Sequence, residues 1–488
     1  MELSKLVNHI KAIQVAGEVE RKDINSICYD SRKVKKGSLF VAIKGFSVDG
    51  HLFIHDAINK GADAVILEDT NAVPEEIFIH EKVAKILVKD SRKALAEASH
   101  TFYKEPSEKI RLIGITGTNG KTTTTFFIKS ILETAGEKTG LIGTITNFIG
   151  KREIKSSLTT PESNDLNELL YEMYNEGCRH VVMEVSSHSL VLNRVYGLNF
   201  SYAVFTNITS DHLDFHHTIE NYISAKKILF NSLNSTSFAI YNSDDEHGTE
   251  MISDTKANLI SYGTSTNSEF RLKDISYDLT GTNFTVEYKG IRYPVSTSLI
   301  GKFNAYNACA AFAAGFVSGI NEENLIEGIK NTKQVPGRFE VIRRENKKVI
   351  IDYSHTADSL EKALEAIKDI AKSSAPVYTV FGCGGNRDKS KRPVMGRVAT
   401  ELSDFAIVTS DNPRFEDPFE IIKNIEAGIK KKNYKVIENR EEAIAYAIKN
   451  SEENAVILIA GKGHENYQEI NGVRTHFSDK EAAEKFLN

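Results

Sequence analysis

The chain has 488 residues, of which 41% are hydrophobic and 26% are charged, and its formal net charge is −5. This length exceeds one ordinary core and indicates about two to four domains of a soluble globular protein. Basic and acidic residues are mixed along the chain, which argues against an electrostatic nucleic-acid binder. No apolar run approaches the roughly 18 residues of a membrane helix, so no membrane partner is expected.

The N-terminus and the cysteines bear on location. Residues 1–13, MELSKLVNHIKAI, are typical of an amphipathic helix rather than a signal peptide. Cys28, Cys178, Cys309 and Cys383 lie far apart and form no CxxC pair. They are interpreted as free thiols of a reducing compartment, so the sequence predicts a cytoplasmic protein.

Residues 1–92 alternate short apolar runs with helical patterns. The segments are SLFVAI, HLFIHDAINKGA, DAVILED and AKILVKD. This alternation predicts a small α/β domain.

A glycine-rich stretch, GITGTNGKTTT, opens the central region at residues 114–124. It follows the apolar run Ile110 to Ile115 and precedes a helix-like segment, Phe126 to Ala135. Strand, glycine-rich turn and helix in this order make a phosphate cradle, in which backbone N–H groups and the helix N-terminus face the anion. Lys121 can reach the terminal phosphates and Thr122 can bind Mg²⁺. Strict Walker spacing asks for glycine at 115, where isoleucine stands. The competing interpretation is a glycine-rich turn with a chance lysine.

Two further apolar runs of the central region end in polar residues. HVVMEV (180–185) places Glu184 at the end of a buried strand, where a carboxylate needs a metal ion or a nearby arginine. YAVFTNI (202–208) leads into a loop that carries Asp211, His212, Asp214, His216 and His217. These side chains could be metal ligands, acid–base groups or a solvated loop. The His–x₃–His spacing has no cysteine beside it, which argues against zinc.

The rest of the chain changes character twice. Residues 238–300 read as several short β segments, followed by an alanine-rich helical pattern, FNAYNACAAFAAGF. After a predicted hinge at Pro336 and Gly337, four apolar runs suit strands covered on both faces of a parallel sheet. Each run ends in a polar or glycine-rich loop, and such loops converge on ligands at the carboxyl ends of strands. The four loops are SHTADSL, CGGNRDKSKR, DNPRFEDP and GKGHENYQ.

Taken in order, these motifs resemble the Mur ligases of bacterial cell-wall synthesis over nearly the whole chain. The segments that carry the resemblance are YDSRKVKKGSLFVAIKGFSVDGH, GTNGKTTT, TTPES, EVSSHSLVLNRV, TNITSDHLDFH, AKKILF, GKFNAYNACAA, PGRFE, DYSHTADSL, GCGGNRDKSKRP, DNPRFEDP and GKGHENYQ. The resemblance implies a three-domain α/β protein. Residues 1–92 would bind a UDP-sugar, and residues 93–334 would bind ATP on a P-loop domain with a parallel sheet and a smaller β region. A Rossmann-like domain, 335–488, would bind the incoming amino acid.

The reaction implied by the resemblance is ATP-driven amide formation in peptidoglycan precursor synthesis. A carboxylate of UDP-MurNAc-L-Ala-D-Glu would attack the γ-phosphate of ATP and become an acyl phosphate. The amino group of a diamino acid would then displace phosphate. The expected protein is a monomer with these small-molecule partners.

The resemblance also implies roles around ATP. Lys121, His212 and Lys226 would be catalytic, and Mg²⁺ would be held by Thr122, Glu184, His212 and a carbamate that CO₂ forms on Lys226. A carbamate requires a neutral amine, so burial or nearby cations must lower the pKa of Lys226 from about 10.4. The competing interpretation of Lys226 is an ordinary helix-surface lysine. The implied ATP-binding residues are Gly117, Thr118, Asn119, Gly120, Lys121, Thr122, Thr123, Asn304, Arg338, Asp352 and His355.

The two substrate ends follow from the same resemblance. Ser31 and His51 would line the uridine and pyrophosphate pocket. Thr159, Thr160, Ser186 and Arg194 match positions that grip the MurNAc-peptide end. Two departures are visible: Leu192 stands where some members carry glutamine, and Ala357 replaces a proline.

The DNPR segment at 411–414 bears on the choice of amino acid. A guanidinium holds a carboxylate bidentately, and meso-diaminopimelate has a distal carboxylate that lysine lacks. Arg414 therefore favours meso-diaminopimelate, with Glu465 and Asp411 receiving the distal ammonium. The companions implied for this pocket are Arg387, Asp411, Asn412, Pro413, Gly461 and Glu465. On its own, DNPR is more typical of a type I turn with Pro413 at its second position.

Several alternatives stay open at this point. Lanthionine also has a distal carboxylate, so a lysine- or lanthionine-adding ligase is the nearest rival. Folylpolyglutamate synthetase shares the chemistry but usually lacks a comparable region before the P-loop. A nucleotide-binding switch protein is the alternative from another class.

Overall fold

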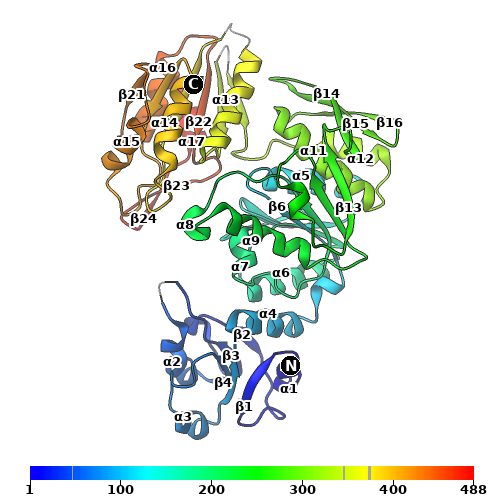
Figure 1. Cartoon of the computed structure of the whole chain (residues 1–488). Coiled ribbons are helices and arrows are strands. Elements are labelled where there is room, and N and C mark those ends of the chain that lie inside the picture. Colours follow the sequence, from blue (N-terminus) through cyan, green and yellow to red (C-terminus); the bar gives the residue numbers. More distant parts are fainter. Residues whose placement is uncertain (47, 345–346, 372–374, 488) are drawn as a thin grey trace.

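The computed structural model describes residues 1–46, 48–344, 347–371 and 375–487. Their strands form sheets of five, eleven and six strands and one two-stranded hairpin. Figure 1 shows three α/β bodies along the chain: blue at the N-terminus, cyan to green in the centre, and yellow to red at the C-terminus. The predicted three-domain α/β architecture is confirmed.

The N-terminal sheet has the order β1-β5-β4-β3-β2, with β1 antiparallel to a parallel core. The predicted helix over residues 1–13 is wrong in length, because α1 ends at Val7 and Ala12 begins a strand. Helix α4 crosses the predicted boundary at residue 92 and buries Ala94, Leu95 and Ala98 in the N-terminal core. The elements are α1 Leu3–Val7, β1 Ala12–Ala16, β2 Ser26–Cys28, η1 Ser31–Lys33, β3 Ser38–Val41, η2 Gly50–Phe53, α2 Ile54–Asn59, β4 Ala62–Leu67, α3 Glu75–His80, β5 Ala84–Val88 and α4 Ser91–Phe102.

The central sheet has the order β16-β15-β14-β13-β12-β11-β6-β10-β7-β8-β9. Its middle, from β13 to β7, is parallel. Strands β14 to β16 form the predicted smaller β region, and they pair antiparallel. The elements are η3 Pro106–Glu108, β6 Arg111–Thr116, α5 Lys121–Thr134, β7 Thr139–Ile142, β8 Thr146–Ile149, β9 Arg152–Lys155, α6 Ser163–Asn175, β10 His180–Glu184, α7 Ser187–Val191, β11 Phe200–Phe205, α8 Leu213–His216, α9 Ile219–Asn231, β12 Phe238–Asn242, α10 Gly248–Met251, β13 Asn258–Gly263, β14 Phe270–Asp278, β15 Gly281–Tyr288, β16 Ile291–Thr297, α11 Lys302–Val317 and α12 Glu322–Lys330.

Apolar residues on both faces explain why β6 and β10 lie at the centre of this sheet. Ile113 and Ile115 point to one core with α5 and α11, whereas Leu112 points to a second core on the other face. Near-continuous apolar strands are typical of parallel sheets covered on both sides. Since parallel strands end at one edge, the loops after β6, β10 and β11 meet there.

The C-terminal sheet has the order β17-β18-β22-β19-β20-β21, and only β17 is antiparallel to its neighbour. The four predicted strands are β18, β19, β20 and β22. The elements are β17 Glu340–Arg344, β18 Lys347–Asp352, α13 Ala357–Ala371, β19 Val377–Phe381, α14 Lys391–Leu402, β20 Phe405–Val408, α15 Pro418–Glu426, β21 Tyr434–Val436, α16 Arg440–Asn450, β22 Val456–Ala460, β23 Tyr467–Ile470, β24 Val473–His476 and α17 Asp479–Leu487.

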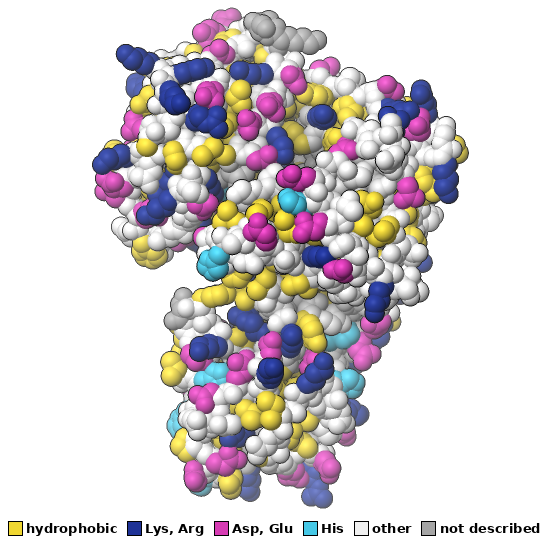
Figure 2. All heavy atoms as spheres, in the orientation of Figure 1, with side chains coloured by type: hydrophobic (Ala, Val, Ile, Leu, Met, Phe, Trp, Pro, Cys, Tyr) yellow, Lys and Arg dark blue, Asp and Glu magenta, His cyan; other side chains and the backbone are white. Residues whose placement is uncertain are grey.

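The C-terminal domain contacts the central domain at its phosphate cradle. The Asn119 side-chain amide donates to Asp358 on α13 at 3.0 Å. His355 Nε2 lies 3.6 Å from Asp211 Oδ2. Figure 2 shows that the surface is hollowed between this domain and the N-terminal one below it. No helix in the described ranges is both long and apolar enough to cross a membrane.

Candidate functional site

The glycine-rich loop between β6 and α5 has the backbone of a phosphate cradle. Gly117 and Gly120 have φ of 146° and 89°, values that strain other residues. A side chain at Gly120 would also meet the Asn307 amide oxygen at 2.3 Å. Helix α5 begins at Lys121, five residues before the predicted start at Phe126, so its N-terminus faces the loop. The chance-turn interpretation therefore does not account for this loop.

The loop is fixed by contacts with the segment that follows β11. Asn119 N–H donates to the Asn207 side chain at 3.0 Å, and Thr118 N–H donates to the Asn207 carbonyl at 2.8 Å. Lys121 Nζ donates to the carbonyls of Gly117 and Thr118, both at 2.9 Å. Burial lowers the pKa of Lys121, and the nearby Glu184 carboxylate opposes that shift. Thr123 is buried in the first turn of α5.

The side chains of Thr122 and Glu184 contact each other next to this loop. The Thr122 hydroxyl lies 3.0 Å from each Glu184 oxygen. Glu184 is fully buried and also accepts from the N–H and the hydroxyl of Thr144, at 2.8 and 3.0 Å. Among the described residues, no Lys, Arg or His lies within ion-pair distance of it. Arg338 donates to the Thr122 hydroxyl at 3.2 Å, not to the carboxylate.

This donor set fits Mg²⁺. A buried carboxylate beside a hydroxyl supplies the hard oxygen ligands that Mg²⁺ prefers, and its negative charge has no ion-paired cation. The arginine alternative for Glu184 is wrong, since no arginine among the described residues pairs with Glu184 and Arg338 donates to the Thr122 hydroxyl instead.

Lys226 lies on α9 and is not a surface lysine. Its side chain is buried, and its ammonium donates to the Gly117 carbonyl at 2.8 Å and lies 4.4 Å from the Tyr222 ring centroid. Burial first, and the neighbouring Lys121 charge second, hold the pKa of Lys226 well below its usual range. The lysine thus meets the condition for a neutral amine, and the surface-helix interpretation is wrong.

His212 precedes α8 with φ of 55°, a left-handed conformation uncommon outside glycine. Its ring packs edge-on to His188, with centroids 4.9 Å apart, and its Nε2 lies 3.4 Å from Asp211. Burial lowers the pKa of His212 to about 3, which keeps the imidazole neutral. His216 bonds Ser187 through Nε2 at 2.9 Å. No three His, Cys, Asp or Glu side chains in the described segments are grouped to hold a metal ion by themselves.

The segment around Arg338 joins the second and third domains. The Arg338 guanidinium stacks 4.6 Å from the Tyr353 ring centroid and reaches Thr122. Asp352 accepts from the Phe339 N–H at 2.7 Å, and burial raises the pKa of Asp352. These contacts place Arg338 at the cradle and Asp352 beside the segment that carries Arg338. Asn304, in the first turn of α11, donates to the Ile300 carbonyl at 2.9 Å and is buried.

The two residues predicted for the uridine pocket lie in the N-terminal domain, Ser31 in η1 and His51 in η2, and both of these short helices contact α2. Ser31 is buried in η1, and its carbonyl accepts from Lys60 at 3.1 Å. His51 uses both ring nitrogens internally: Nε2 accepts from Glu68 N–H at 3.0 Å, so Nδ1 donates to Asp49 at 2.7 Å. His51 therefore holds its loop, and its ring has no nitrogen left for a ligand in this arrangement.

The residues predicted for the MurNAc-peptide end lie together at the carboxyl end of β10. The Thr160 hydroxyl donates to the Glu184 carbonyl at 2.8 Å and accepts from Ser186 N–H at 3.2 Å. Arg194 donates to the Thr160 carbonyl at 3.1 Å and pairs with Glu162 at 2.9 Å. The Thr159 hydroxyl bonds Thr144 at 3.1 Å, which links this group to the Glu184 carboxylate.

The DNPR segment lies beside two glycine-rich loops of the third domain. Its turn runs from Pro413 to Glu416, with Arg414 at φ 53°, one residue later than a type I turn with Pro413 second would have it. Arg414 donates one hydrogen bond to the Gly385 carbonyl at 2.8 Å. A side chain at Gly384 would meet the Arg414 guanidinium at 2.9 Å and the aliphatic stem of Arg387 at 3.8 Å, so the two arginine side chains flank this glycine.

The acidic side of this pocket holds a lysine that the sequence analysis missed. Lys462 is fully buried, lies 3.2 Å from Glu465 and donates to the Asn412 amide oxygen at 3.0 Å. Asn412 in turn donates to Glu465 at 2.8 Å. The Asp411 carboxylate accepts from Asn412 N–H at 2.6 Å. A side chain at Gly461 would meet the other oxygen of this carboxylate at 2.7 Å. Burial raises the pKa of Glu465, and Lys462 opposes that shift.

Two other residues were missed. Thr144 supplies two hydrogen bonds to Glu184, and Asp358 reaches the P-loop from the third domain. Neither belongs to a spacing pattern, because each acts through a contact between distant segments. Lys462 could have been found from the sequence, because it lies between Gly461 and Gly463 just after the buried strand β22.

Family models cover most of the chain. The Mur ligase family catalytic domain matches residues 23–103, the Mur ligase middle domain matches 115–315, and the Mur ligase glutamate ligase domain matches 337–463.

Curated relatives match over their full length. A UDP-N-acetylmuramoyl-L-alanyl-D-glutamate–2,6-diaminopimelate ligase of Clostridium acetobutylicum is 44% identical over 100% of this chain and 99% of its own. A ligase of the same name from Bacillus cereus is 45% identical over 100% and 98%.

Solved structures agree in fold. One described as a UDP-N-acetylmuramoyl-L-alanyl-D-glutamate–2,6-diaminopimelate ligase has a TM-score of 0.71 and 31% identity, over 100% of this chain and 98% of that one. A folylpolyglutamate synthase of Mycobacterium tuberculosis, at 18% identity and a TM-score of 0.62, covers 75% of this chain and 91% of its own. The second likeness is one of fold alone.

Proposed function

This chain belongs to the Mur ligase family, and we propose that it joins meso-diaminopimelate to UDP-MurNAc-L-Ala-D-Glu with ATP, in peptidoglycan precursor synthesis. The observation that carries the proposal is full-length identity of 42% and 44% to 45% with curated ligases of that name. The region before the P-loop, which matches the family's catalytic-domain model, argues against a folylpolyglutamate synthetase.

In the first step two anions must meet, since the substrate carboxylate attacks the γ-phosphate. Charge neutralisation is then the main task of the protein. Lys121, at the start of α5, and Arg338, which reaches Thr122 from the hinge, are the cations at the cradle. Thr122 and Glu184 would hold Mg²⁺, whose chemistry is to offset the phosphate charge.

Lys226 and His212 would complete the phosphate site. Carbamylation would convert the neutral Lys226 amine, whose ammonium form burial and the Lys121 charge disfavour, into an anion that the Lys121 charge stabilises. His212 is neutral and so can offer a nitrogen lone pair to a second Mg²⁺.

In the second step the amino acid must be oriented toward the acyl phosphate. The Arg414 fork would hold the distal carboxylate of diaminopimelate, with Arg387 across Gly384. Because Lys462 already pairs with Glu465, Asp411 is the carboxylate left to attract the distal ammonium. Lysine would leave Arg414 without its partner, a loss worth about 10⁴–10⁵ in discrimination where polar groups are stranded.

The remaining parts of the proposal concern the substrate ends and the state of the protein. The N-terminal domain would bind UDP around Ser31, with His51 shaping the loop. The Thr159, Thr160, Ser186 and Arg194 group would face the MurNAc-peptide. We expect a cytoplasmic monomer, consistent with the four free, buried cysteines.

The test is a panel of amino acids assayed for phosphate release with UDP-MurNAc-L-Ala-D-Glu, ATP and Mg²⁺. Meso-diaminopimelate should support turnover, and omission of either the UDP-dipeptide or the amino acid should stop it. Preference for L-lysine or lanthionine would reassign the amino acid. Phosphate release that needs neither co-substrate would instead favour a nucleotide-binding switch.

A further inference from the structure

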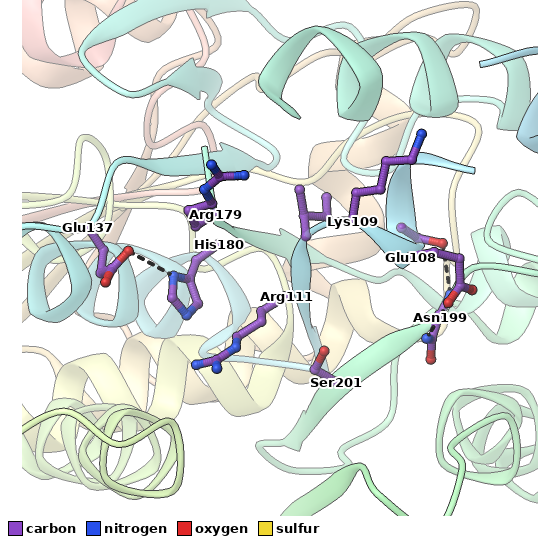
Figure 3. Close-up of a pocket in the computed structure, with 10 residues that line it drawn as sticks. Glu108, Lys109, Arg111, Glu137, Arg179, His180, Asn199 and Ser201 are labelled. Carbon is purple, nitrogen blue, oxygen red and sulfur yellow. Dashed lines mark hydrogen bonds and ion pairs between the residues drawn. The ribbon is translucent and has the colours of Figure 1, made fainter. Parts of the chain in front are cut away.

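A cavity separate from the proposed active site lies at the amino ends of the central strands, opposite the edge that carries the P-loop. It has a volume of about 470 Å³ and is drawn in Figure 3. Arg111 begins β6 and His180 begins β10, and the two residues are register partners in neighbouring parallel strands. Strand β6 rises about 3.3 Å per residue, so Arg111 and Thr116 at its two ends are about 17 Å apart.

His180 is the feature of this cavity that calls for a ligand. Its side chain is 4% exposed, and both ring nitrogens are buried without a hydrogen-bond partner. Glu137 lies 3.7 Å from Nδ1, too far for a hydrogen bond. Burial lowers the pKa of His180, so the ring is neutral and can present one N–H donor. Figure 3 shows the ring between Glu137 and Arg111, pointing into the cavity. A buried polar group in this state is costly unless something binds it.

The groups around His180 set the charge of the ligand. Lys109, Arg111 and Arg179 line the cavity together with the acidic Glu108 and Glu137. Glu108 is used at the far end, where it accepts from Asn199 at 2.9 Å. At the His180 end, Arg111 and Arg179 outnumber Glu137, so this half of the cavity carries a net positive formal charge.

The two arginines at this end have donors to spare. Arg111 makes one long hydrogen bond, 3.5 Å, to the Ser318 carbonyl. Within the described part of the chain, the Arg179 guanidinium has no hydrogen bond or ion pair. Helices α5 and α11 also end at this edge, and their carbonyl ends favour cations. Arg111 contacts one of these carbonyls, whereas no described residue accepts a hydrogen bond from the Arg179 guanidinium, so its donors are available to a ligand.

We propose that this cavity binds a phosphate group, held by the guanidinium groups of Arg111 and Arg179 and by an N–H of His180. Guanidinium forks match phosphate oxygens bidentately, and Ser201, also in the lining, offers a hydroxyl. The cavity is larger than one phosphate ion, so it can take either free phosphate or a phosphate monoester. The site is separate from the P-loop, so it stands whichever amino acid the ligase adds.

The test measures binding by calorimetry on the full chain with Mg²⁺ and a saturating non-hydrolysable ATP analogue, which occupies the P-loop. Inorganic phosphate and glycerol phosphate are titrated separately. Arg179→Gln and His180→Gln should each weaken binding by about tenfold, as expected for loss of a hydrogen bond to a charged group. Lys151→Gln removes an exposed charge in the β8–β9 turn outside the cavity and should leave binding unchanged.

Equal affinity for the two probes would identify a free-phosphate site, whereas tighter glycerol phosphate binding would identify a monoester site. Absence of saturable binding, or equal affinity in the wild type and both cavity variants, would overturn the proposal. Arg179 is exposed, so Arg179→Gln keeps the test valid even if His180→Gln does not fold.

Discussion

Lys121 is the P-loop residue whose charge is proposed to face the terminal phosphates of ATP. It lies at the N-terminus of α5, and its ammonium is fixed by two loop carbonyls. We expect Lys121→Ala to reduce phosphate release by at least about 10²–10³-fold, the scale seen when one transition-state donor is lost. Lys129→Ala, on the same helix, removes a lysine paired with Glu133 and should retain turnover. Near-normal phosphate release in Lys121→Ala would contradict the assignment.

Arg414 tests the amino-acid pocket. Its fork is proposed to hold a distal carboxylate, so Arg414→Ala should raise KM for diaminopimelate by about 10- to 100-fold, while KM for ATP changes little. The matched control is Arg397→Ala on α14, where the arginine pairs with Glu401 at the surface. Equal rises in both KM values would move Arg414 out of this pocket.

Lys226 tests the carbamate. Its lowered pKa means that the neutral amine is present at lower pH than for an ordinary lysine. Removal of CO₂ and bicarbonate should therefore reduce wild-type activity, and bicarbonate should restore it. Lys226→Ala and Lys226→Arg should be weakly active at any bicarbonate concentration. Wild-type turnover that is indifferent to CO₂ would exclude a carbamate role.

At the scale of elements, a buried ion pair supports the amino-acid pocket. Arg440 on α16 and Asp479 on α17 are fully buried, and Arg440 makes two 2.7 Å bonds to the carboxylate. Arg440 also donates to the carbonyls of Ser410 and Ala460, which directly precede Asp411 and Gly461. The pair thus connects two helices to the loops that carry the pocket.

We expect Asp479→Asn to destabilise the C-terminal domain by about 3–5 kcal/mol, because it strands a buried guanidinium charge. The same variant should raise KM for diaminopimelate, because Arg440 would no longer hold the loops that begin at Asp411 and Gly461 in place. Thermal unfolding and steady-state kinetics measure both effects, with the exposed Glu484→Gln as control. An unchanged Tm would show that the pair is not a structural support.

The order of elements could largely be predicted from the sequence, whereas their ends could not. Apolar runs such as those of β6, β10 and β22 identify parallel strands on their own. The start of α5 was predicted five residues late, because Thr122 to Thr125 are weak helix formers whose helical state is fixed by burial. The N-terminal helix was predicted too long, since pairing of β1 with β5 outweighs the amphipathic pattern.

At the scale of the whole molecule, the third domain lies over the phosphate cradle. Asp358 accepts from Asn119, and His355 faces Asp211, so contacts between the two domains are already formed at the cradle. A hollow remains on the side of the N-terminal domain (Figure 2). Bound UDP-substrate and ATP should therefore be enclosed by a movement of the outer domains.

We expect small-angle scattering to show a smaller radius of gyration with the UDP-dipeptide and a non-hydrolysable ATP analogue than without ligands. The particle mass should stay at that of one 54.3 kDa chain. Asp358→Ala should weaken the contraction, whereas Glu453→Ala, at an exposed position just before β22 in the same domain, should not. An unchanged radius would contradict ligand-driven closure, and a doubled mass would contradict the monomer.

Strand periodicity, glycine positions and motif order were enough to predict the three α/β domains, the P-loop and the family, because they are properties of neighbouring residues. The fold was needed to find that Glu184 has Thr122 and Thr144 as partners, that Lys226 is buried near Lys121, and that Lys462 pairs with Glu465. Burial and charge pairing depend on which distant segments meet, and that is settled by packing of the whole chain rather than by any local pattern.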